Sequence, residues 1–305
     1  MSKKILITGS NGLLGQKLIS LLSKIPDIEL IATAKGQNRL HFTEGYRFLS
    51  MDITDENQVK SVIDSTQPDV IIHTAAMTNV DQCESEKDLC WAMNVDAVKY
   101  LVNASKSNNS HLIHLSTDFI FDGLAGPYDE NAKPNSLSFY GDSKLAAEEI
   151  VINSNIRWSI ARTVLVYGIV SDMSRTNIIL WVKKSLEDGK NIKVVTDQFR
   201  TPTLAEDLAM GCWQIALKEA VGIFNISGKD FLTPYEMAIK TAEFFGLDKT
   251  LISKADSSTF SQPAKRPPKT GFIIDKAISL LGYKPHSFDE GIKIVAEQFE
   301  KVNKV

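Results

Sequence analysis

The stretch KILITGSNGLLG, residues 4–15, decides the fold of this chain. A strand-like apolar run ends at Gly9, and a helical apolar pattern that includes Leu14 and Leu18 follows at once. Glycine is needed where a chain turns tightly, approaches a pyrophosphate or packs a helix closely on a strand, and the start of a helix offers free N–H groups. The spacing GxxGxxG, one residue wider at its start than GxGxxG, therefore predicts a dinucleotide-binding loop, with an ordinary strand-to-helix turn as the alternative. The loop would consist of Gly9, Ser10, Asn11, Gly12, Leu13, Leu14 and Gly15.

The same alternation continues through the first half of the chain. Strand-like apolar runs are found at residues 4–8, 29–33, 47–51, 70–73, 112–116 and 159–163, and amphipathic stretches at 13–23, 56–65, 88–107 and 143–151. Strands that alternate with helices predict an α/β fold of the Rossmann type, a doubly wound parallel sheet covered by helices on both faces.

The rhythm loosens after about residue 168, where loop-forming segments interrupt the pattern. A helix at 204–217 and a short strand at 222–225 are expected to return to the main sheet. We therefore predict a dinucleotide-binding Rossmann domain of residues 1–167 plus about 204–226. A smaller, discontinuous C-terminal substrate lobe would comprise about 168–203 plus 227–305.

The composition excludes several classes of protein. The chain has 305 residues, 43% of them hydrophobic, and a net charge of −3 without a basic stripe, so we expect no nucleic-acid partner. Nowhere do 18 apolar residues follow one another, and the N-terminus enters a strand directly, so we expect no membrane partner. Cys83, Cys90 and Cys212 lack the spacing of metal ligands, which predicts no metal site, no disulfide framework and a cytoplasmic location. A small-molecule substrate is the default, and a homodimer stays open.

Two cations near the second strand bear on the choice of cofactor. An NAD-specific site usually places an acid after this strand for the ribose 2′-OH, whereas the segment here reads Thr-Ala-Lys-Gly, residues 33–36, with Arg39 nearby. Because Lys35 and Arg39 suit a 2′-phosphate, we predict NADP(H) as the preferred cofactor and NAD(H) as a second option. Both cations would otherwise be solvated loop charges. Asp52 and Ile53, after the third strand, are expected near the adenine.

Tyr140 and Lys144 form a YxxxK pair near the start of a helix, where both side chains project from one face. A phenol with an ordinary pKa of about 10 becomes a usable acid near neutrality if an ammonium group stabilises its phenolate. Thr117 follows the strand at 112–116, so its hydroxyl could share a substrate carbonyl oxygen with Tyr140. A hydroxyl that only caps a turn is the alternative for Thr117.

These features in this order resemble the extended short-chain dehydrogenase/reductase family, over nearly the whole chain. Several segments are more specific and resemble the dTDP-4-dehydrorhamnose reductases. They are HTAAMTNVDQCESE at 73–86, LSTDFIFDG at 115–123, YGDSKLAAE at 140–148, RTVLVYG at 162–168 and DQFRTPT at 197–203.

The resemblance implies that NADPH or NADH delivers hydride to the C4 ketone of a nucleotide-linked 4-keto-6-deoxy sugar, as in dTDP-L-rhamnose biosynthesis. Tyr140 would protonate the new alkoxide, Lys144 would hold the nicotinamide ribose and lower the pKa of Tyr140, and Thr117 would bond the ketone oxygen. Asp118 and Phe119 would border the sugar. The resemblance also implies cofactor contacts from Ala75, Ala76, Thr78, Thr163 and Val166.

Two arginines are further candidates for substrate binding. Arg200 stands in DQFRTPT where the reductases tend to carry glycine, and it would either reshape the pocket, grip a phosphate, or be a surface charge. Arg266, in KRPPKTG at 265–271, would meet a nucleotide diphosphate from the second lobe.

Two other enzymatic activities and one non-catalytic role are alternatives for a chain of this fold. A dehydratase of this fold would usually carry Glu where Phe119 stands, which disfavours dehydration. An epimerase would use the same Thr117, Tyr140 and Lys144 with a tightly held NAD. A non-catalytic regulatory subunit that resembles the methionine adenosyltransferase β subunit is the alternative from a different class, and the intact YxxxK pair argues against it.

Overall fold

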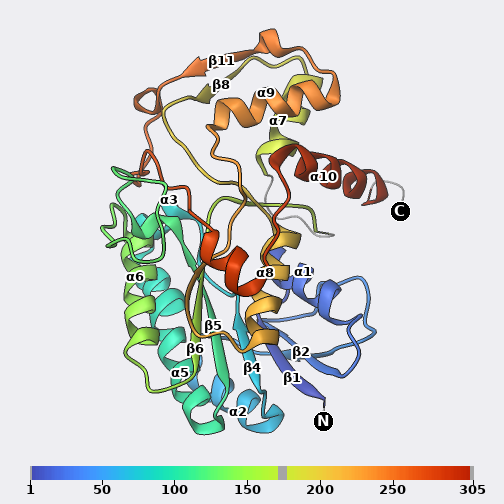
Figure 1. Ribbon diagram of the computed structural model, residues 1–305, viewed down its shortest axis with the longest axis vertical. Helices are drawn as coiled ribbons and strands as arrows, with labels where there is room; N and C mark the ends of the chain where they lie inside the picture. Colours follow the sequence, from blue (N-terminus) through green and yellow to red (C-terminus); the bar gives the residue numbers. More distant parts are fainter. Residues whose placement is uncertain (1, 171–176, 303–305) are drawn as a thin grey trace.

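The computed structural model describes residues 2–170 and 177–302 and confirms the α/β fold. Its centre is a seven-stranded parallel sheet in the order β10-β6-β5-β4-β1-β2-β3. The strands are β1 (Lys3–Thr8), β2 (Ile28–Ala34), β3 (Arg47–Ser50), β4 (Val70–His73), β5 (His111–Thr117), β6 (Trp158–Thr163) and β10 (Gly222–Asn225). The carboxyl ends of these strands point towards the second lobe (Figure 1).

Successive side chains of a strand point to opposite faces of the sheet, and in these strands both sets are apolar. Helices therefore cover both faces of the sheet. Ile5, Ile72 and Ile113 face one layer of helices, whereas Leu6, Ile71 and Leu112 face the other. The first layer is α1 (Leu13–Leu22) and α8 (Ala205–Lys218); the second is α2 (Glu56–Thr66), α5 (Ala97–Asn108) and α6 (Phe139–Ile152). Figure 1 shows the two layers on opposite sides of the strands.

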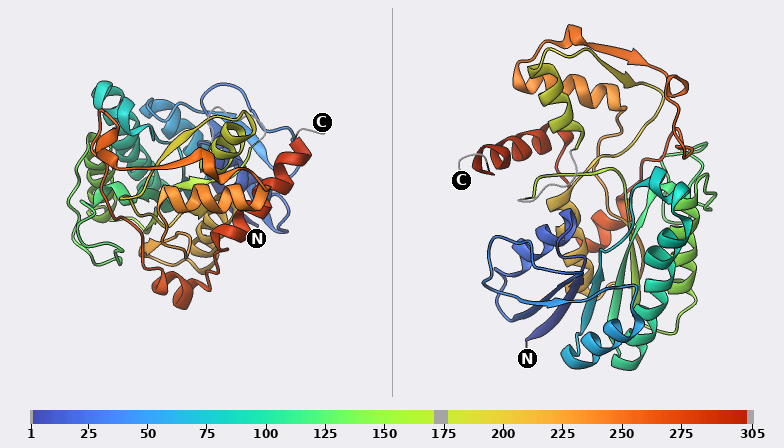
Figure 2. Two further views of the ribbon diagram at one scale, coloured as in Figure 1. Left: turned by 90° about the horizontal axis from the view of Figure 1, so that it is seen from above. Right: turned by 180° about the vertical axis from the view of Figure 1, so that it is seen from behind.

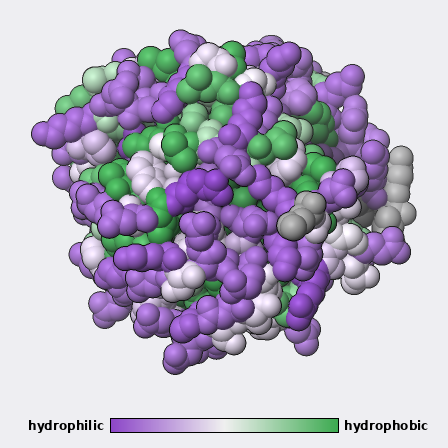
Figure 3. Space-filling view, turned by 60° about the horizontal axis from the view of Figure 1, so that its bottom comes forward, coloured by the Kyte–Doolittle hydropathy of each residue, from purple (hydrophilic) through white to green (hydrophobic). Residues whose placement is uncertain are grey.

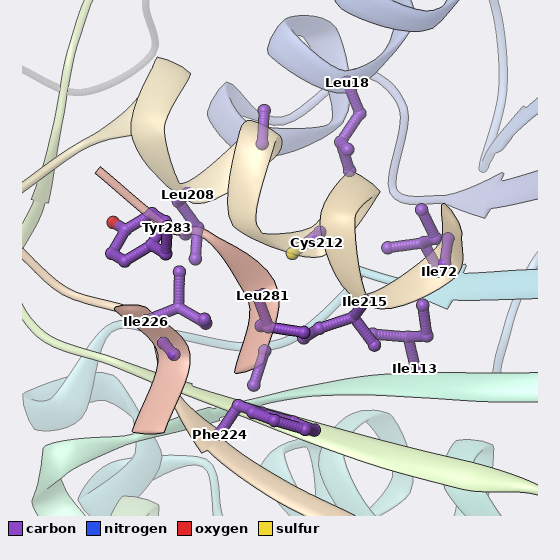
Figure 4. Packing of buried hydrophobic residues seen from close by; sticks show 14 of the residues in the cluster. Leu18, Ile72, Ile113, Leu208, Cys212, Ile215, Phe224, Ile226, Leu281 and Tyr283 are labelled. Atoms are coloured by element: carbon purple, nitrogen blue, oxygen red, sulfur yellow. The ribbon is translucent and has the colours of Figure 1, made fainter. Parts of the chain in front are cut away.

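The larger core cluster lies between α8 and the sheet. Leu208, Cys212 and Ile215 of α8 belong to this cluster, and in Figure 4 Ile215 lies beside Ile113 while Leu208 lies beside Tyr283. Each fully buried side chain of this size stabilises the fold by roughly 1.5–3 kcal/mol relative to an exposed one. The return of the chain to the Rossmann domain through α8 and β10 is therefore held by apolar packing.

The second lobe stands above the sheet in Figure 1, and the view from behind in Figure 2 shows the same separation. It contains α7 (Ile178–Glu187), β8 (Ile192–Val195), α9 (Pro234–Phe245), β11 (Ile252–Ala255) and α10 (Phe288–Val302). β8 and β11 pair in parallel, and β7 (Val166–Tyr167) pairs in parallel with β9 (Thr203–Leu204) as a separate two-stranded sheet. The domain boundaries drawn from the sequence stay a prediction.

The helix expected over residues 88–107 is interrupted. The chain forms α4 (Lys87–Trp91), one wide π-helical turn, η1 (Ala92–Asp96), and then α5. Asn94 lies in the wide turn, where its side chain accepts a hydrogen bond from the Met77 amide and donates to the Met77 carbonyl oxygen. The periodic pattern predicts a helix in this region but not the wide turn. The turn places the Asn94 side chain against Met77, and such a contact between distant segments leaves no trace in the periodicity of the helix.

Among residues 2–170 and 177–302, no helix is long and apolar enough to span a bilayer. The face in Figure 3 carries scattered hydrophobic side chains between hydrophilic ones.

Candidate functional site

The glycine loop lies between β1 and α1, and its three glycines do different work. Gly9 has a φ of +67°, and a Cβ there would lie 2.7 Å from the Ala75 backbone nitrogen. A Cβ on Gly15 would lie 2.3 Å from the Gly9 carbonyl oxygen, so Gly15 allows α1 to approach the loop. Gly12 is the N-cap of α1 and lines the adjacent pocket. Gly9 and Gly15 thus shape the turn, and Gly12 faces the space where a ligand would lie.

The start of α1 fits a pyrophosphate. Its N-cap Gly12 supplies no side-chain hydrogen bond, and its first turn contains no acidic residue. The first amides of the helix are therefore left for an anion, which the helix dipole also favours. Ser116 lines the same pocket, and its buried Oγ has no hydrogen-bond partner within the described residues. These features fit a dinucleotide cofactor.

A pocket of about 580 Å³ connects the glycine loop with the YxxxK pair. It lies at the carboxyl ends of the strands, where ligands bind in open parallel sheets. The residues of the sequence-predicted site that line it are Asn11, Gly12, Leu13, Leu14, Ala76, Thr78, Thr117, Tyr140, Lys144, Thr163 and Val166. Leu115, Gly168 and Asn177 also line it, although sequence reasoning did not single them out.

The pair itself is buried: Tyr140 is 8% exposed and Lys144 3%. Burial raises the pKa of Tyr140 well above its ordinary value, and a hydrogen bond with the Thr117 side chain acts in the opposite direction. Burial lowers the pKa of Lys144 to about 8, and the Glu148 carboxylate partly offsets this effect. The net effect on Tyr140 is a raised pKa, so the lowering expected from Lys144 is not found, and Tyr140 is held as a protonated phenol one helical turn from Lys144 on α6.

Ser138 and Gly141 set the position of Tyr140. The Ser138 Oγ caps α6 by accepting a hydrogen bond from the Gly141 amide, so the helix begins at Phe139 rather than at residue 143. A Cβ on Gly141 would lie 2.2 Å from the Phe119 carbonyl oxygen. Gly141 therefore brings Tyr140 close to Thr117 and to the Phe119 ring, which it meets edge to face at 5.8 Å. Sequence reasoning missed this glycine, although it stands directly after Tyr140.

We expect Gly141→Ala to lower kcat at least about tenfold, because the added methyl pushes α6 away from the Thr117 turn and a displacement of about 1 Å is costly in catalysis. Steady-state kinetics with the substrates proposed below measure this. Gly189→Ala is the control for strain without a clash: its φ of +68° should cost some stability, but a Cβ there meets nothing within 4 Å and the residue lies outside the pocket, so kcat should not change. An unchanged kcat in Gly141→Ala would contradict the positioning role.

Thr117 has two roles in the geometry. Its hydroxyl caps a short 3₁₀ turn, η2 (Asp118–Ile120), by accepting from the Phe119 amide, and it also lines the pocket. The capping alternative and the predicted site position are therefore compatible.

Asp118 and Arg200 face each other across the lobes. The Arg200 Nε lies 3.6 Å from the Asp118 Oδ2, and the guanidinium also donates to the carbonyl oxygens of Phe199, Pro267 and Pro268. Burial raises the pKa of Asp118, whereas Arg200 and Thr270 act in the opposite direction. Arg200 is only 6% exposed, so the expectation of a surface charge is wrong. The Arg200 side chain instead joins the 197–203 loop to Pro267 and Pro268, and it lies next to Asp118, the residue after Thr117.

Arg266 ties the second lobe to the Rossmann domain. Its Nη1 and Nη2 donate to the two carboxylate oxygens of Asp81 at 3.1 and 2.7 Å. Asp81 belongs to α3 (Val80–Ser85). Arg200, Arg266, Asp118 and Phe119 lie outside the pocket lining, and their contacts with substrate stay predictions.

The residues predicted at the adenosine end, Lys35, Arg39, Asp52 and Ile53, also lie outside the pocket lining. The Asn11 side chain accepts from the Arg39 amide and donates to the Gln37 carbonyl oxygen, so it holds the 35–39 loop against the glycine turn. Lys35 Nζ lies 2.7 Å from Asp52 Oδ2. Ile53 is buried, and Ala75 backs Gly9. Their contacts with a cofactor stay predictions.

Comparison with known proteins gives a consistent result. The model of the family described as RmlD substrate binding domain matches residues 3–301. The chain is 32% identical to a dTDP-4-dehydrorhamnose reductase of Aggregatibacter actinomycetemcomitans, over 95% of this chain and 97% of that protein. It is also 32% identical to methionine adenosyltransferase 2 subunit beta of Bos taurus, over 81% of this chain and 73% of that protein.

Solved structures agree with the fold. A dTDP-4-dehydrorhamnose reductase of Bacillus anthracis in complex with NADP superposes with a TM-score of 0.83 at 27% identity, covering 98% of this chain and all of that one. A Clostridium acetobutylicum dTDP-4-dehydrorhamnose reductase gives a TM-score of 0.85 at 29% identity, with 97% and 99% covered. The Bordetella bronchiseptica enzyme WbmG in complex with NAD shares the fold at 20% identity, with a TM-score of 0.83 and 99% and 95% covered.

Proposed function

Since the chain belongs to the RmlD substrate binding domain family, within the extended short-chain dehydrogenases/reductases, we propose that it is an NAD(P)H-dependent oxidoreductase. Its substrate is a nucleotide-linked 4-keto-6-deoxy sugar, whose C4 ketone it reduces, as the dTDP-4-dehydrorhamnose reductases that it resembles do. The observation that carries the proposal is the pocket that joins the uncapped start of α1 with Thr117, Tyr140 and Lys144.

The residues of the pocket divide the work. A nicotinamide dinucleotide held at the start of α1 and in this pocket would supply the hydride for the new C–H bond at C4, so the residues of the pocket must handle the charge that the carbonyl oxygen then carries. The Tyr140 hydroxyl gives its proton to that oxygen, and Thr117 holds the same oxygen by a hydrogen bond. Lys144 keeps an ammonium group beside Tyr140, which stabilises the phenolate left behind. The phenolate then regains a proton from solvent.

Oxidation of NADPH and of NADH, followed at 340 nm across a panel of dTDP-, UDP- and GDP-linked 4-keto-6-deoxy sugars, tests this function. We expect turnover with a dTDP-linked substrate. Binding of NADPH without turnover of any member of the panel would contradict the proposal.

For the cofactor we propose NADP(H) over NAD(H), with Lys35 and Arg39 at the 2′-phosphate. The structure of the Bacillus anthracis dTDP-4-dehydrorhamnose reductase in complex with NADP supports this choice. Lys35→Glu is expected to reduce the preference for NADPH roughly tenfold, because it replaces an attractive charge by a repulsive one. Asp52→Asn is the opposite test, since it releases Lys35 from its ion pair and should raise the preference. Ratios of kcat/KM for the two cofactors measure both, and an unchanged ratio in both variants would remove Lys35 from the site.

A second candidate function rests on the similarity to methionine adenosyltransferase 2 subunit beta. A regulatory subunit would bind a synthetase and would not need the Tyr140 hydroxyl. Co-purification with a methionine adenosyltransferase, together with full function of Tyr140→Phe in that complex, would favour it. An epimerase would instead retain NAD through purification.

We propose the cytoplasm as the location. All three cysteines lie in the described residues as buried thiols, which suits a reducing compartment. A homodimer is also proposed, to be measured by analytical ultracentrifugation.

A further inference from the structure

A buried polar layer lies beneath the pocket, and neither the sequence nor the proposed function explains it. On one face of the sheet, Leu6, Ile71 and Leu112 form an apolar row across β1, β4 and β5. Two residues further along each strand, the same face carries Thr8, His73 and His114, all buried. Burying polar groups in place of apolar ones costs stability, so this row calls for a function.

His114 is the member of this row that contacts a residue of the pocket lining, Lys144. Its Nε2 lies 3.1 Å from the Lys144 Nζ. His73 stacks on it with ring centroids 5.5 Å apart, and the His73 Nδ1 is engaged by the Thr8 hydroxyl at 2.7 Å. Burial, together with the Lys144 charge, lowers the pKa of His114 well below its ordinary value, so the imidazole is neutral. A neutral imidazole nitrogen without a proton is an acceptor for an ammonium N–H.

We propose that His114 is a positioning residue for Lys144: its Nε2 accepts a hydrogen bond from the ammonium group and thereby fixes that group beside Tyr140. The catalytic consequence rests on the function proposed above, but the hydrogen bond itself does not. The contact uses one N–H of Lys144, and among residues 2–170 and 177–302 no further hydrogen bond of this ammonium group is found. Because an ammonium N–H donates a stronger hydrogen bond than an amine N–H, the contact favours the charged form of Lys144 in a site where burial favours the neutral amine.

The charged and titratable side chains around Lys144 affect how readily its ammonium group loses a proton. The titratable or charged side chains that face it or its neighbours are Tyr140 and Glu148 on α6, His114 on β5, His73 on β4, Cys90 on α4 and Arg162 on β6. Glu148 raises the pKa of Lys144, but its carboxylate is already bound by Arg162 through two hydrogen bonds. His114 is the group hydrogen-bonded to the amine itself.

The first test uses the unliganded protein. Carbon-13 NMR of ε-labelled lysine, with Lys144→Met to assign the signal, should give a pKa near 8 for Lys144. In His114→Phe, which keeps a planar ring without an acceptor, we expect this pKa to fall by about one pH unit. His114→Gln, which restores an acceptor, should recover most of it. His73→Phe, which changes the stacked neighbour but not the contact, should leave it within about 0.3 unit.

Catalysis supplies the second readout. The reduction requires a charged Lys144, so activity is lost as pH rises through the Lys144 pKa. His114→Phe should therefore lose activity at lower pH than the wild type, and its kcat at pH 6 should also fall by about threefold or more, because the ammonium group is no longer held in place. His114→Gln, which restores an acceptor, should recover both. An absence of reductase activity would refute the proposed function without touching the NMR result.

A measurement on the wild type guards against a variant that does not fold. Nitrogen-15 NMR of the histidine side chains must find His114 with its proton on Nδ1. A proton on Nε2, or a Lys144 pKa unchanged in His114→Phe, would overturn the proposal and leave His114 as core packing.

Discussion

Tyr140→Phe lowers kcat at least ~10²-fold while the affinity for NADPH changes little, because it removes a proton donor and no phosphate contact. The Tyr140 ring keeps its edge-to-face contact with Phe119, so the loss reports the hydroxyl and not the packing. Stopped-flow single turnovers measure the chemical step, and quenching of protein fluorescence measures binding of NADPH.

The control for this variant is Tyr128→Phe. Tyr128 is buried to a similar degree, but its hydroxyl donates to Asp122 outside the pocket. We expect a modest loss of stability and an unchanged kcat. A Tyr140→Phe enzyme within about threefold of the wild type would refute the assigned role of general acid.

Arg162→Met destabilises the protein by about 3–5 kcal/mol, because it leaves the Glu148 charge buried without its partner. The two side chains are 3% and 1% exposed and lie 2.7 Å apart at their closest atoms. Arg162 also donates to the Glu130 carbonyl oxygen, so its removal leaves more than one acceptor unpaired. Urea denaturation measures the change in the free energy of unfolding.

The double variant Glu148→Leu with Arg162→Met should recover most of this loss, since a buried ion pair is often replaceable by well-packed apolar groups. The exposed pair Lys184–Asp188 is the matched control. Lys184→Met should leave the denaturation midpoint unchanged within error. If Arg162→Met proved equally neutral, the pair would not hold α6 to β6.

The sequence predicts those features of the site that are formed by neighbouring residues, and it does not predict contacts between distant segments. The loop from Gly9 to Gly15 lies between adjacent elements, so spacing alone reveals it. The partners of Lys35 and of Arg200 come from distant segments, and the sequence places neither the Asp52 ion pair nor the burial of Arg200. Only the geometry could reveal that Arg200 serves carbonyl oxygens in another loop.

The contact of His114 shows the same limit. It depends on the register that sets β4 beside β5 and on the depth at which α6 packs over them, and neither appears in a local pattern. A histidine three residues before Thr117 reads as an ordinary strand residue. The signal that could have suggested more is its neighbour in the parallel register, His73, which is equally polar in an otherwise apolar run.

The position of β10 has a consequence for biosynthesis. The outer edge of β6 pairs with β10, which leaves the ribosome only after residues 164–221 have been made. Until then the nascent sheet exposes an unpaired edge and the apolar face that α8 later covers. A chain that stalls before residue 222 is therefore expected to require chaperone protection, and slow translation of this stretch should raise aggregation.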